Sequence, residues 1–182
     1  MAVPDADALI QALGLTPHPE GGHYRETWRT STLVGTDHGP RPAGTAILFL
    51  LAAGQCSRWH RIRSDEVWLH QGGGPLIIHE LCASSGVLQQ TRLGLNLPAG
   101  ETPQHGVMAG RWFAAEPLQT DGWSLVGCSV APGFCFEDFE LATAADLEPH
   151  HRVLDRHCPG WRGLCHGSDS EPPLAPSAQS QA

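Results

Sequence analysis

A histidine and a glutamate six residues apart, framed by two glycines, could serve acid–base chemistry or metal binding. The series is Gly54, His60, Ile62, Glu66 and Gly73. Residues two apart share one face of a strand, so a tight turn after Ile62 would direct the side chains of His60 and Glu66 toward one point. A neutral imidazole beside a carboxyl group can accept and donate a proton. We therefore predict catalytic roles for His60 and Glu66.

Further polar candidates lie on the same strand faces. Tyr24, the only tyrosine, shares a face with Glu26 in the expected strand 23–29, so we predict the phenol as a catalytic acid and Glu26 as a substrate ligand. By the same alternation Arg58 shares a face with His60, and its guanidinium could bind an anionic group of the substrate. An ion pair of Arg58 with an acidic neighbour is the structural alternative.

The remaining predicted substrate-binding residues are mostly aromatic. The aromatic residues would form the pocket wall. The two others are a histidine that follows Glu66 on its strand and a carboxylate that could orient His60. The aromatic rings could instead simply fill a core, which would favour a structural role. These five candidates are Trp68, His70, Phe113, Phe136 and Asp138.

The spacing from Gly54 to Gly73 resembles the first signature motif of the cupin superfamily, in which a second histidine usually stands at the position of Ile62. Residues 107–113 resemble the second signature, although Phe113 stands where a histidine is usual. The resemblance implies an all-β fold, a double-stranded β-helix or jelly-roll barrel with short flanking helices. It also implies an interior pocket that binds a small molecule.

In metal-binding cupins the two histidines and the glutamate of the first motif hold the ion together with the histidine of the second. Two of these four positions are apolar here, and zinc or iron sites need at least three N, O or S ligands. We therefore expect no cofactor. The alternative is a metal-dependent oxygenase or isomerase that uses His60, Glu66 and His70, with His105 or Tyr24 as other possible ligands.

Longer segments resemble a little-characterised branch of the superfamily that is filed as a domain of unknown function. In this branch the position of Ile62 is commonly apolar. The resemblance covers most of residues 9–142, and its segments are PHPEGGHYRETWRT (17–30), SRWHRIRSDEVW (57–68), GGPL (73–76) and SLVGCSVAPGFCFEDFELA (124–142).

A weaker similarity points to a reaction. Residues 20–29, EGGHYRETWR, are similar to the opening strand of the nucleotide-sugar 3,5-epimerases, which are also cupins. This resemblance implies His60 as general base and a tyrosine, here Tyr24, as proton donor, with no metal. We expect a sugar epimerase or isomerase acting on a polar, carbohydrate-like ligand, with a non-catalytic ligand-binding cupin as the alternative.

Short strands joined by tight turns must position these side chains. The 182 residues suit one domain, and 21 glycines and 15 prolines are far more turn residues than a helical bundle tolerates. Turn signals recur at the spacing of all-β proteins. We expect strands near residues 23–29, 44–53, 57–62, 66–70, 75–82, 87–94, 105–108, 111–115, 123–130 and 134–141.

Helical segments should flank the barrel. Asp5 can cap an N-terminal helix, and Gly14 can end it in the left-handed conformation. The histidines and cysteines of residues 150–166 fit no standard zinc spacing, so we expect an interface or tail helix there. The expected parts are an N-terminal helix packing on the barrel, the barrel, a C-terminal helical extension and a disordered tail, at residues 1–15, 16–145, 146–166 and 167–182.

The charge and the lengths of the apolar stretches limit which partners and which location we expect. The net charge is -8, and all 11 basic residues are arginine without a basic run, which argues against nucleic acid or an anionic membrane surface. The longest apolar stretch, 46–53, is too short to cross a bilayer, and the N-terminus lacks a signal-peptide pattern. We expect a cytoplasmic protein with reduced cysteines, and the cupin resemblance implies a homodimer.

Overall fold

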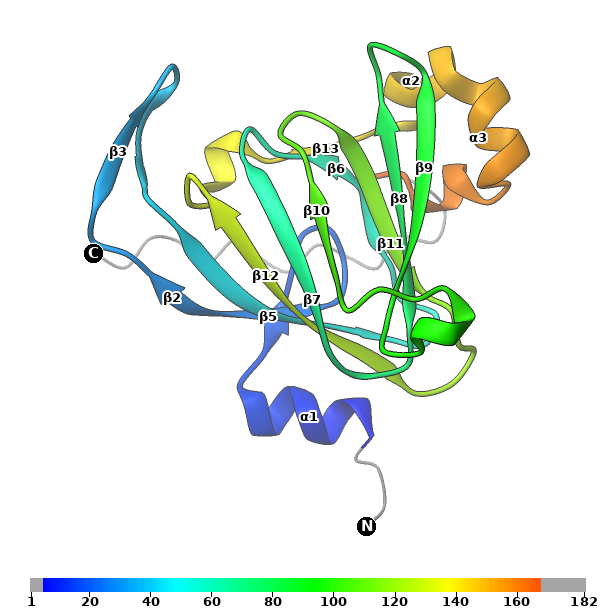
Figure 1. Cartoon of the computed structure of the whole chain (residues 1–182), viewed down its shortest axis with the longest axis horizontal. Coiled ribbons are helices and arrows are strands. Elements are labelled where there is room, and N and C mark those ends of the chain that lie inside the picture. The colour runs from blue at the N-terminus through cyan, green and yellow to red at the C-terminus, as the bar shows by residue number, and fades with distance from the viewer. Residues whose placement is uncertain (1–4, 168–182) are drawn as a thin grey trace.

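Two facing antiparallel sheets form most of the protein (Figure 1), whose computed structural model describes residues 5–167. The six-stranded sheet has the order β1 (Thr16–Pro17), β2 (His23–Arg29), β5 (Thr45–Ala52), β12 (Trp123–Ala131), β7 (Asp65–Gly73) and β10 (Gln104–Val107). The five-stranded sheet has the order β13 (Glu140–Leu141), β6 (Ser57–Arg61), β11 (Trp112–Pro117), β8 (Leu76–Cys82) and β9 (Val87–Leu93). This is the jelly roll that the sequence predicts.

The main core lies between the two sheets and is built by strand alternation. Phe49 and Leu51 of β5 both point into it, and they are almost completely buried. Each such side chain contributes roughly 1.5–3 kcal/mol on burial. The other buried members are Trp68, Leu76, Ile78, Leu93, Val107, Phe113, Ala115, Val126 and Cys128.

The N-terminal helix has the predicted ends. Helix α1 (Ala6–Leu13) begins after Asp5, whose carboxylate accepts a hydrogen bond from the backbone N–H of Ala8 at 2.7 Å. It ends at Gly14, which has a φ of 62°. The helix contacts β5 and lies below the six-stranded sheet in Figure 1.

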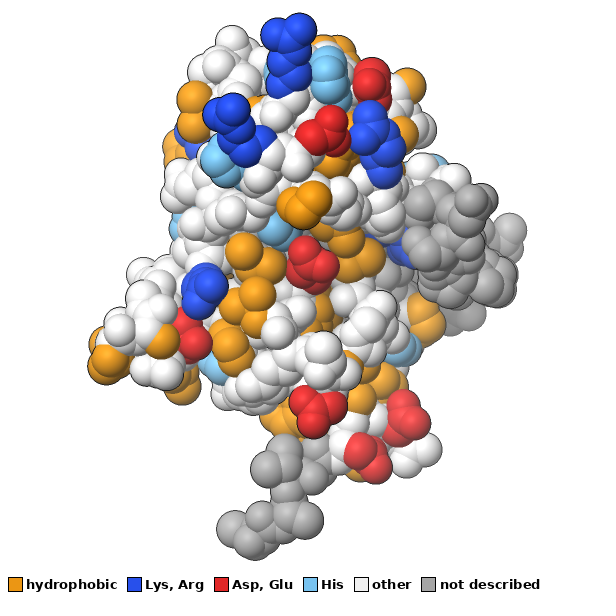
Figure 2. Space-filling view, turned by 90° about the vertical axis from the view of Figure 1, so that its right-hand side faces the viewer, with side chains coloured by type: hydrophobic (Ala, Val, Ile, Leu, Met, Phe, Trp, Pro, Cys, Tyr) orange, Lys and Arg blue, Asp and Glu red, His pale blue; other side chains and the backbone are white. Residues whose placement is uncertain are grey.

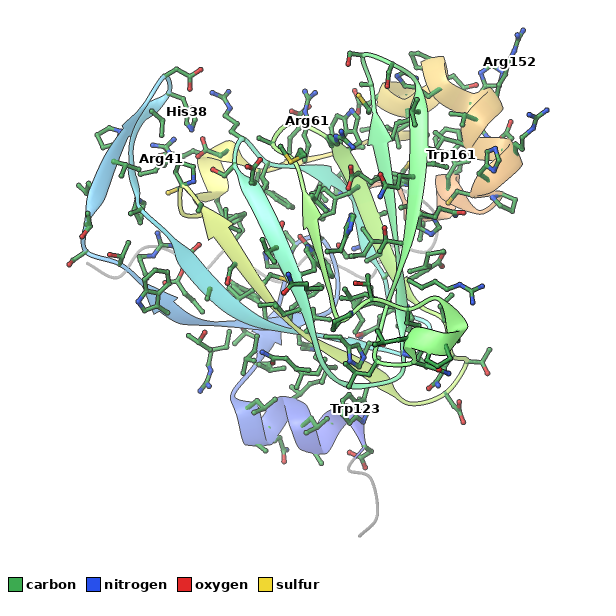
Figure 3. The ribbon with its side chains drawn as sticks, in the orientation of Figure 1. His38, Arg41, Arg61, Trp123, Arg152 and Trp161 are labelled. Carbon is green, nitrogen blue, oxygen red and sulfur yellow. The ribbon has the colours of Figure 1, made fainter. Side chains whose placement is uncertain are left out.

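The C-terminal extension covers the outer face of the five-stranded sheet (Figure 1). It consists of α2 (Ala144–Leu147), α3 (His151–His157) and the 3₁₀ turns η3 (Glu148–His150) and η4 (Trp161–Leu164). Trp161, labelled in Figure 3, is fully buried and donates its indole N–H to Asp155 at 2.8 Å. Burial raises the pKa of Cys158 to about 12 and that of Cys165 to about 11, so both thiols serve as small apolar residues.

One predicted strand is wrong and three short ones were not predicted. Residues 134–141 form the 3₁₀ turn η2 (Phe136–Asp138) and only a two-residue strand, because the Asp138 N–H turns back to the Cys135 carbonyl at 3.0 Å. The short strands β1, β3 (Leu33–Thr36) and β4 (Gly39–Pro42) lack an apolar alternation. A further 3₁₀ turn is η1 (Leu97–Ala99). The predicted disordered tail lies outside the described residues apart from Gly167.

The face that carries the extension has mixed charge. Figure 2 shows arginines toward its top and acidic side chains near the N-terminal end at its bottom. Within residues 5–167, no helix is long and apolar enough to span a membrane.

Replacing Trp161 by Ala tests the contribution of the extension to stability. Emptying this buried site should lower the free energy of unfolding by about 3–5 kcal/mol, measured by urea denaturation. Trp28→Ala is the control, because the Trp28 side chain is 54% exposed and its loss should cost about 1 kcal/mol or less. Equal losses in the two variants would contradict a stabilising role of the extension.

Candidate functional site

A cavity of about 290 Å³ gathers polar side chains from both sheets and from the segment before η2. Of the residues predicted from sequence, the catalytic candidates His60, Glu66 and Tyr24 all line it, together with Glu26 and Phe136. The alternation of β2 and β7 and the pairing of the bulged strand β6 bring the first four side chains together, and Phe136 comes from η2. The remaining lining residues are His18, Glu20, Arg29, Thr45, Ile47, Ile62, Cys128, Val130, Phe134 and Cys135.

His60 is held rigidly on β6. Its ring centroid lies 3.9 Å from that of Phe113, which stands opposite on β11. Its Nδ1 atom lies 2.6 Å from the backbone carbonyl of Arg58, and because a carbonyl only accepts, Nδ1 carries the proton. Burial lowers the pKa of His60 to about 4. At neutral pH the ring is therefore uncharged, and its Nε2 atom presents a lone pair.

Glu20 connects two imidazoles. Its Oε2 atom lies 3.4 Å from Nε2 of His60 and 3.3 Å from Nδ1 of His18. The His18 Nδ1 atom accepts the backbone N–H of Glu20 at 3.3 Å, which occupies its lone pair, whereas Nε2 of His60 presents its lone pair toward the Glu20 carboxyl group. Burial raises the pKa of Glu20, while His18 and the Ser57 hydroxyl partly oppose this shift. The Glu20 carboxyl group is therefore a buried acid with a raised pKa, placed beside both rings.

A glycine turn sets the position of Glu20. Gly21 has a φ of 109°, and a Cβ atom there would lie only 2.2 Å from the Cys56 carbonyl oxygen. The Gly21 N–H bonds to the carbonyl of His18 at 2.9 Å, and the His18 N–H bonds to that of Gly22 at 3.1 Å. Glu20 is absent from the residues predicted from sequence, although the Pro-Glu-Gly-Gly segment marks such a turn.

Glu66 is a second buried carboxyl group in the cavity. It is buried on β7, and burial together with the negative charge of Glu20 raises its pKa to about 8. The neighbouring Cys128 thiol has a strongly raised pKa because it is buried beside Glu66. At neutral pH the Glu66 carboxyl group is thus mostly neutral and can donate a hydrogen bond.

The other side of the cavity is aromatic and contains an ion pair. Arg29 donates to both carboxylate oxygens of Glu26, at 2.9 and 2.6 Å, and to the backbone carbonyl of Phe134 at 3.2 Å. The ring of Tyr24 meets His18 edge-on at a centroid distance of 4.6 Å, and the Phe136 ring stacks on His18 at 5.8 Å. Partly buried Tyr24 has a raised pKa and is therefore a neutral phenol.

The structure does not place Arg58 in this cavity. Phe113 pairs with His60 and Ala115 pairs with Ser57, so two residues of β6 stand opposite a single residue of β11. This β-bulge breaks the alternation. Ser57 and His60 both face Glu20, whereas Arg58 lines a second cavity.

Four further predicted residues also lie outside the cavity lining. Trp68 and Phe113 are fully buried in the core between the sheets. His70 lies farther along β7, where its Nε2 atom is 3.1 Å from the Gly74 carbonyl. Asp138 accepts two hydrogen bonds from Arg41, at 2.7 and 2.9 Å, and Figure 3 shows Arg41 directed from β4 toward η2.

The cavity residues do not fit the metal centre that cupins commonly hold. Ile62 lines the cavity where a second histidine would stand, and Phe113 packs on His60. His70 is not brought together with His60 and Glu66. Across residues 5–167, no three or more His, Cys, Asp or Glu side chains form a group that could hold a metal ion.

Comparisons with known proteins agree with the fold. The model of the family described as Cupin superfamily (DUF985) matches residues 7–142. No curated protein matches the sequence. The solved structure of a hypothetical protein from Leishmania major is 32% identical, with a TM-score of 0.76 over 89% of this chain and 99% of that chain. A protein from Shewanella oneidensis is 40% identical, with a TM-score of 0.76 over 85% of this chain and 96% of that chain.

A more distant likeness supports the fold alone. The capsular polysaccharide assembling protein CapF from Staphylococcus aureus is 13% identical, with a TM-score of 0.52. The match covers 76% of this chain and 32% of that one.

Glu66→Gln should make stability less dependent on pH. Glu66 binds its proton in the folded state up to about pH 8 but has an ordinary value of 4.5, so unfolding releases this proton between the two values. The wild type should therefore lose stability relative to the variant as pH rises from 4.5 to 8, by at most about 5 kcal/mol. Urea denaturation of both proteins across this range measures the difference. If the difference in the free energy of unfolding between the two proteins stays constant across this pH range, the pKa of Glu66 is not raised.

Proposed function

Since the chain belongs to the DUF985 family of the cupin superfamily, we propose that it is a metal-independent acid–base enzyme of the sugar epimerase or isomerase type. The ligand would be polar and carbohydrate-like. One observation carries this proposal: the neutral imidazole of His60, the carboxyl group of Glu20 and the protonated carboxyl group of Glu66 line one cavity. Such a set can move protons without a metal.

His60 is the proposed general base. Because the His60 proton sits on Nδ1, its Nε2 lone pair can take a proton from a carbon beside a carbonyl group. The hydrogen bond from Nδ1 to the Arg58 carbonyl fixes the ring in the tautomer that this step needs. The electron pair of the broken C–H bond moves onto the carbonyl oxygen and forms an enolate.

Two other groups complete the proposed reaction. Glu66 is neutral at pH 7 and can donate a hydrogen bond to the developing enolate oxygen in a buried, weakly screened setting. Tyr24 is the proposed acid that returns a proton to the opposite face of the carbon. Inversion of that carbon would be the net result. The proton taken by His60 returns to solvent, and Tyr24 regains a proton from solvent.

The size and lining of the cavity support a small ligand. Its volume of about 290 Å³ lies at the lower end of the range for small-molecule sites. Acidic and hydroxyl groups can bind sugar hydroxyls, while the rings of Phe134 and Phe136 offer apolar faces. The second candidate function, ligand binding without catalysis, is favoured by the burial of His60, whose side chain is only 2% exposed.

His60→Asn should remove proton abstraction. A panel of keto sugars and nucleotide-linked keto sugars is incubated with the protein in D2O, and NMR follows replacement of the C–H proton. The wild type should exchange at least one compound, and His60→Asn should exchange it at least about 100-fold more slowly. His157→Asn, on the exposed side of α3, is the matched control. An unchanged rate in His60→Asn would refute the catalytic role, and bound but unexchanged ligand would support the non-catalytic function.

Tyr24→Phe should separate the two proton transfers. With the base intact but the opposite-face acid missing, C–H exchange in D2O should fall less than about tenfold. Formation of the inverted sugar should fall by about 100-fold or more. NMR of the same samples reports both signals. Parallel losses of exchange and inversion would contradict the assignment of Tyr24 as the second acid.

A further inference from the structure

A second cavity, of about 350 Å³, lies on the other side of the turn that carries Glu20. It is formed by the glycine turn, β6, the end of β11 and the η4 region, and it shares no lining residue with the first cavity. Its lining comprises Gly21, Gly22, Gly54, Gln55, Cys56, Arg58, Glu116, Pro117, Gly160, Gly163 and Leu164.

Arg58 is the only basic residue of this lining and is 6% exposed. Its backbone is fully engaged, since its N–H donates to Glu20 at 2.8 Å and its carbonyl accepts from His60 at 2.6 Å. Its guanidinium, by contrast, has no hydrogen bond or ion pair with any residue in the range 5–167. The Nη1 atom lies 3.4 Å from the point that a Cβ atom of Gly21 would occupy.

The one acidic residue of the lining does not neutralise Arg58. The Glu116 carboxylate lies 3.0 Å from Nε2 of His79 and its side chain is 43% exposed, so it is turned toward a different partner. Arginine cannot lose its proton in a protein. The guanidinium therefore keeps its charge, and its nitrogens can be reached from the cavity, where an entering anion can pair with them.

The cavity has space for such a group. A Cβ atom added at Gly54 or Gly160 would meet no atom within 4 Å, so both glycines border open space. The planar guanidinium fork binds two oxygens of one group, as phosphates and carboxylates offer. We propose that this cavity is a second binding site, which takes a small oxyanion, a phosphate or a carboxylate, on Arg58.

Calorimetric titration with inorganic phosphate and with acetate tests the site, at ionic strength held constant with chloride. The wild type should bind at least one of the two with saturation in the millimolar range or tighter. Arg58→Gln should weaken this binding at least tenfold, and Arg58→Lys should fall in between because it keeps the charge but loses the fork. Binding of phosphate alone or acetate alone identifies the class of oxyanion.

Arg61→Gln is the matched control, because Arg61 lies on the same strand but pairs with Glu140 at 2.7 Å at the surface. It should bind as the wild type does. Gly160→Glu serves as a second variant, since Gly160 has a φ of -94° that accepts a side chain, and its new carboxylate should block anion binding. Equal binding by the wild type, Arg58→Gln and Gly160→Glu would overturn the proposal. The absence of saturable binding to the wild type would overturn it too. If Arg58→Gln does not fold, the comparison of the wild type with Gly160→Glu tests the site instead.

Discussion

The contact between the Glu20 carboxyl group and the His60 imidazole is the constraint around which this protein is organised. It requires a turn that only glycines can make after Glu20, since a side chain at Gly21 would collide with the Cys56 carbonyl. It also requires a bulge in β6, which turns Ser57 and His60 to the same side. Ser57 then holds one carboxyl oxygen while the other faces the imidazole. Sheet pairing, turn and bulge thus converge on the contact between these two side chains.

Strand alternation made much of the fold and part of the site predictable. His60, Glu66, Tyr24 and Glu26 come together because residues two apart share a face and the paired strands bring these faces inward. Arg58 breaks this rule, since a bulge depends on strand pairing and has no marker in the local sequence. Glu20 was equally hidden, because its neighbours come from a turn and from a strand 37 residues away. The family resemblance supplied the fold and left the reaction open.

Without the usual metal ligands, burial sets the protonation states of the side chains in this cavity. Ile62 and Phe113 stand beside His60, and Arg29 is paired with Glu26. Among residues 5–167 Glu66 therefore has no cationic partner, and it keeps its proton instead. Burial that would destabilise a free carboxylate instead keeps Glu66 neutral and raises the pKa of Glu20. The same burial keeps His60 uncharged. The apolar residues at these two positions therefore leave His60 and Glu66 as neutral hydrogen-bonding groups.

The turn at Glu20 also has two sides. Its carboxyl group faces one cavity, while its backbone carbonyl holds the N–H of Arg58 at the edge of the other. A single peptide segment therefore forms the partition between two chambers. If a molecule bound on one side changes the affinity of the other side by moving this partition, thermodynamic reciprocity requires that occupancy of the other side change the affinity of the first by the same factor. Any such coupling through this wall would act in both directions.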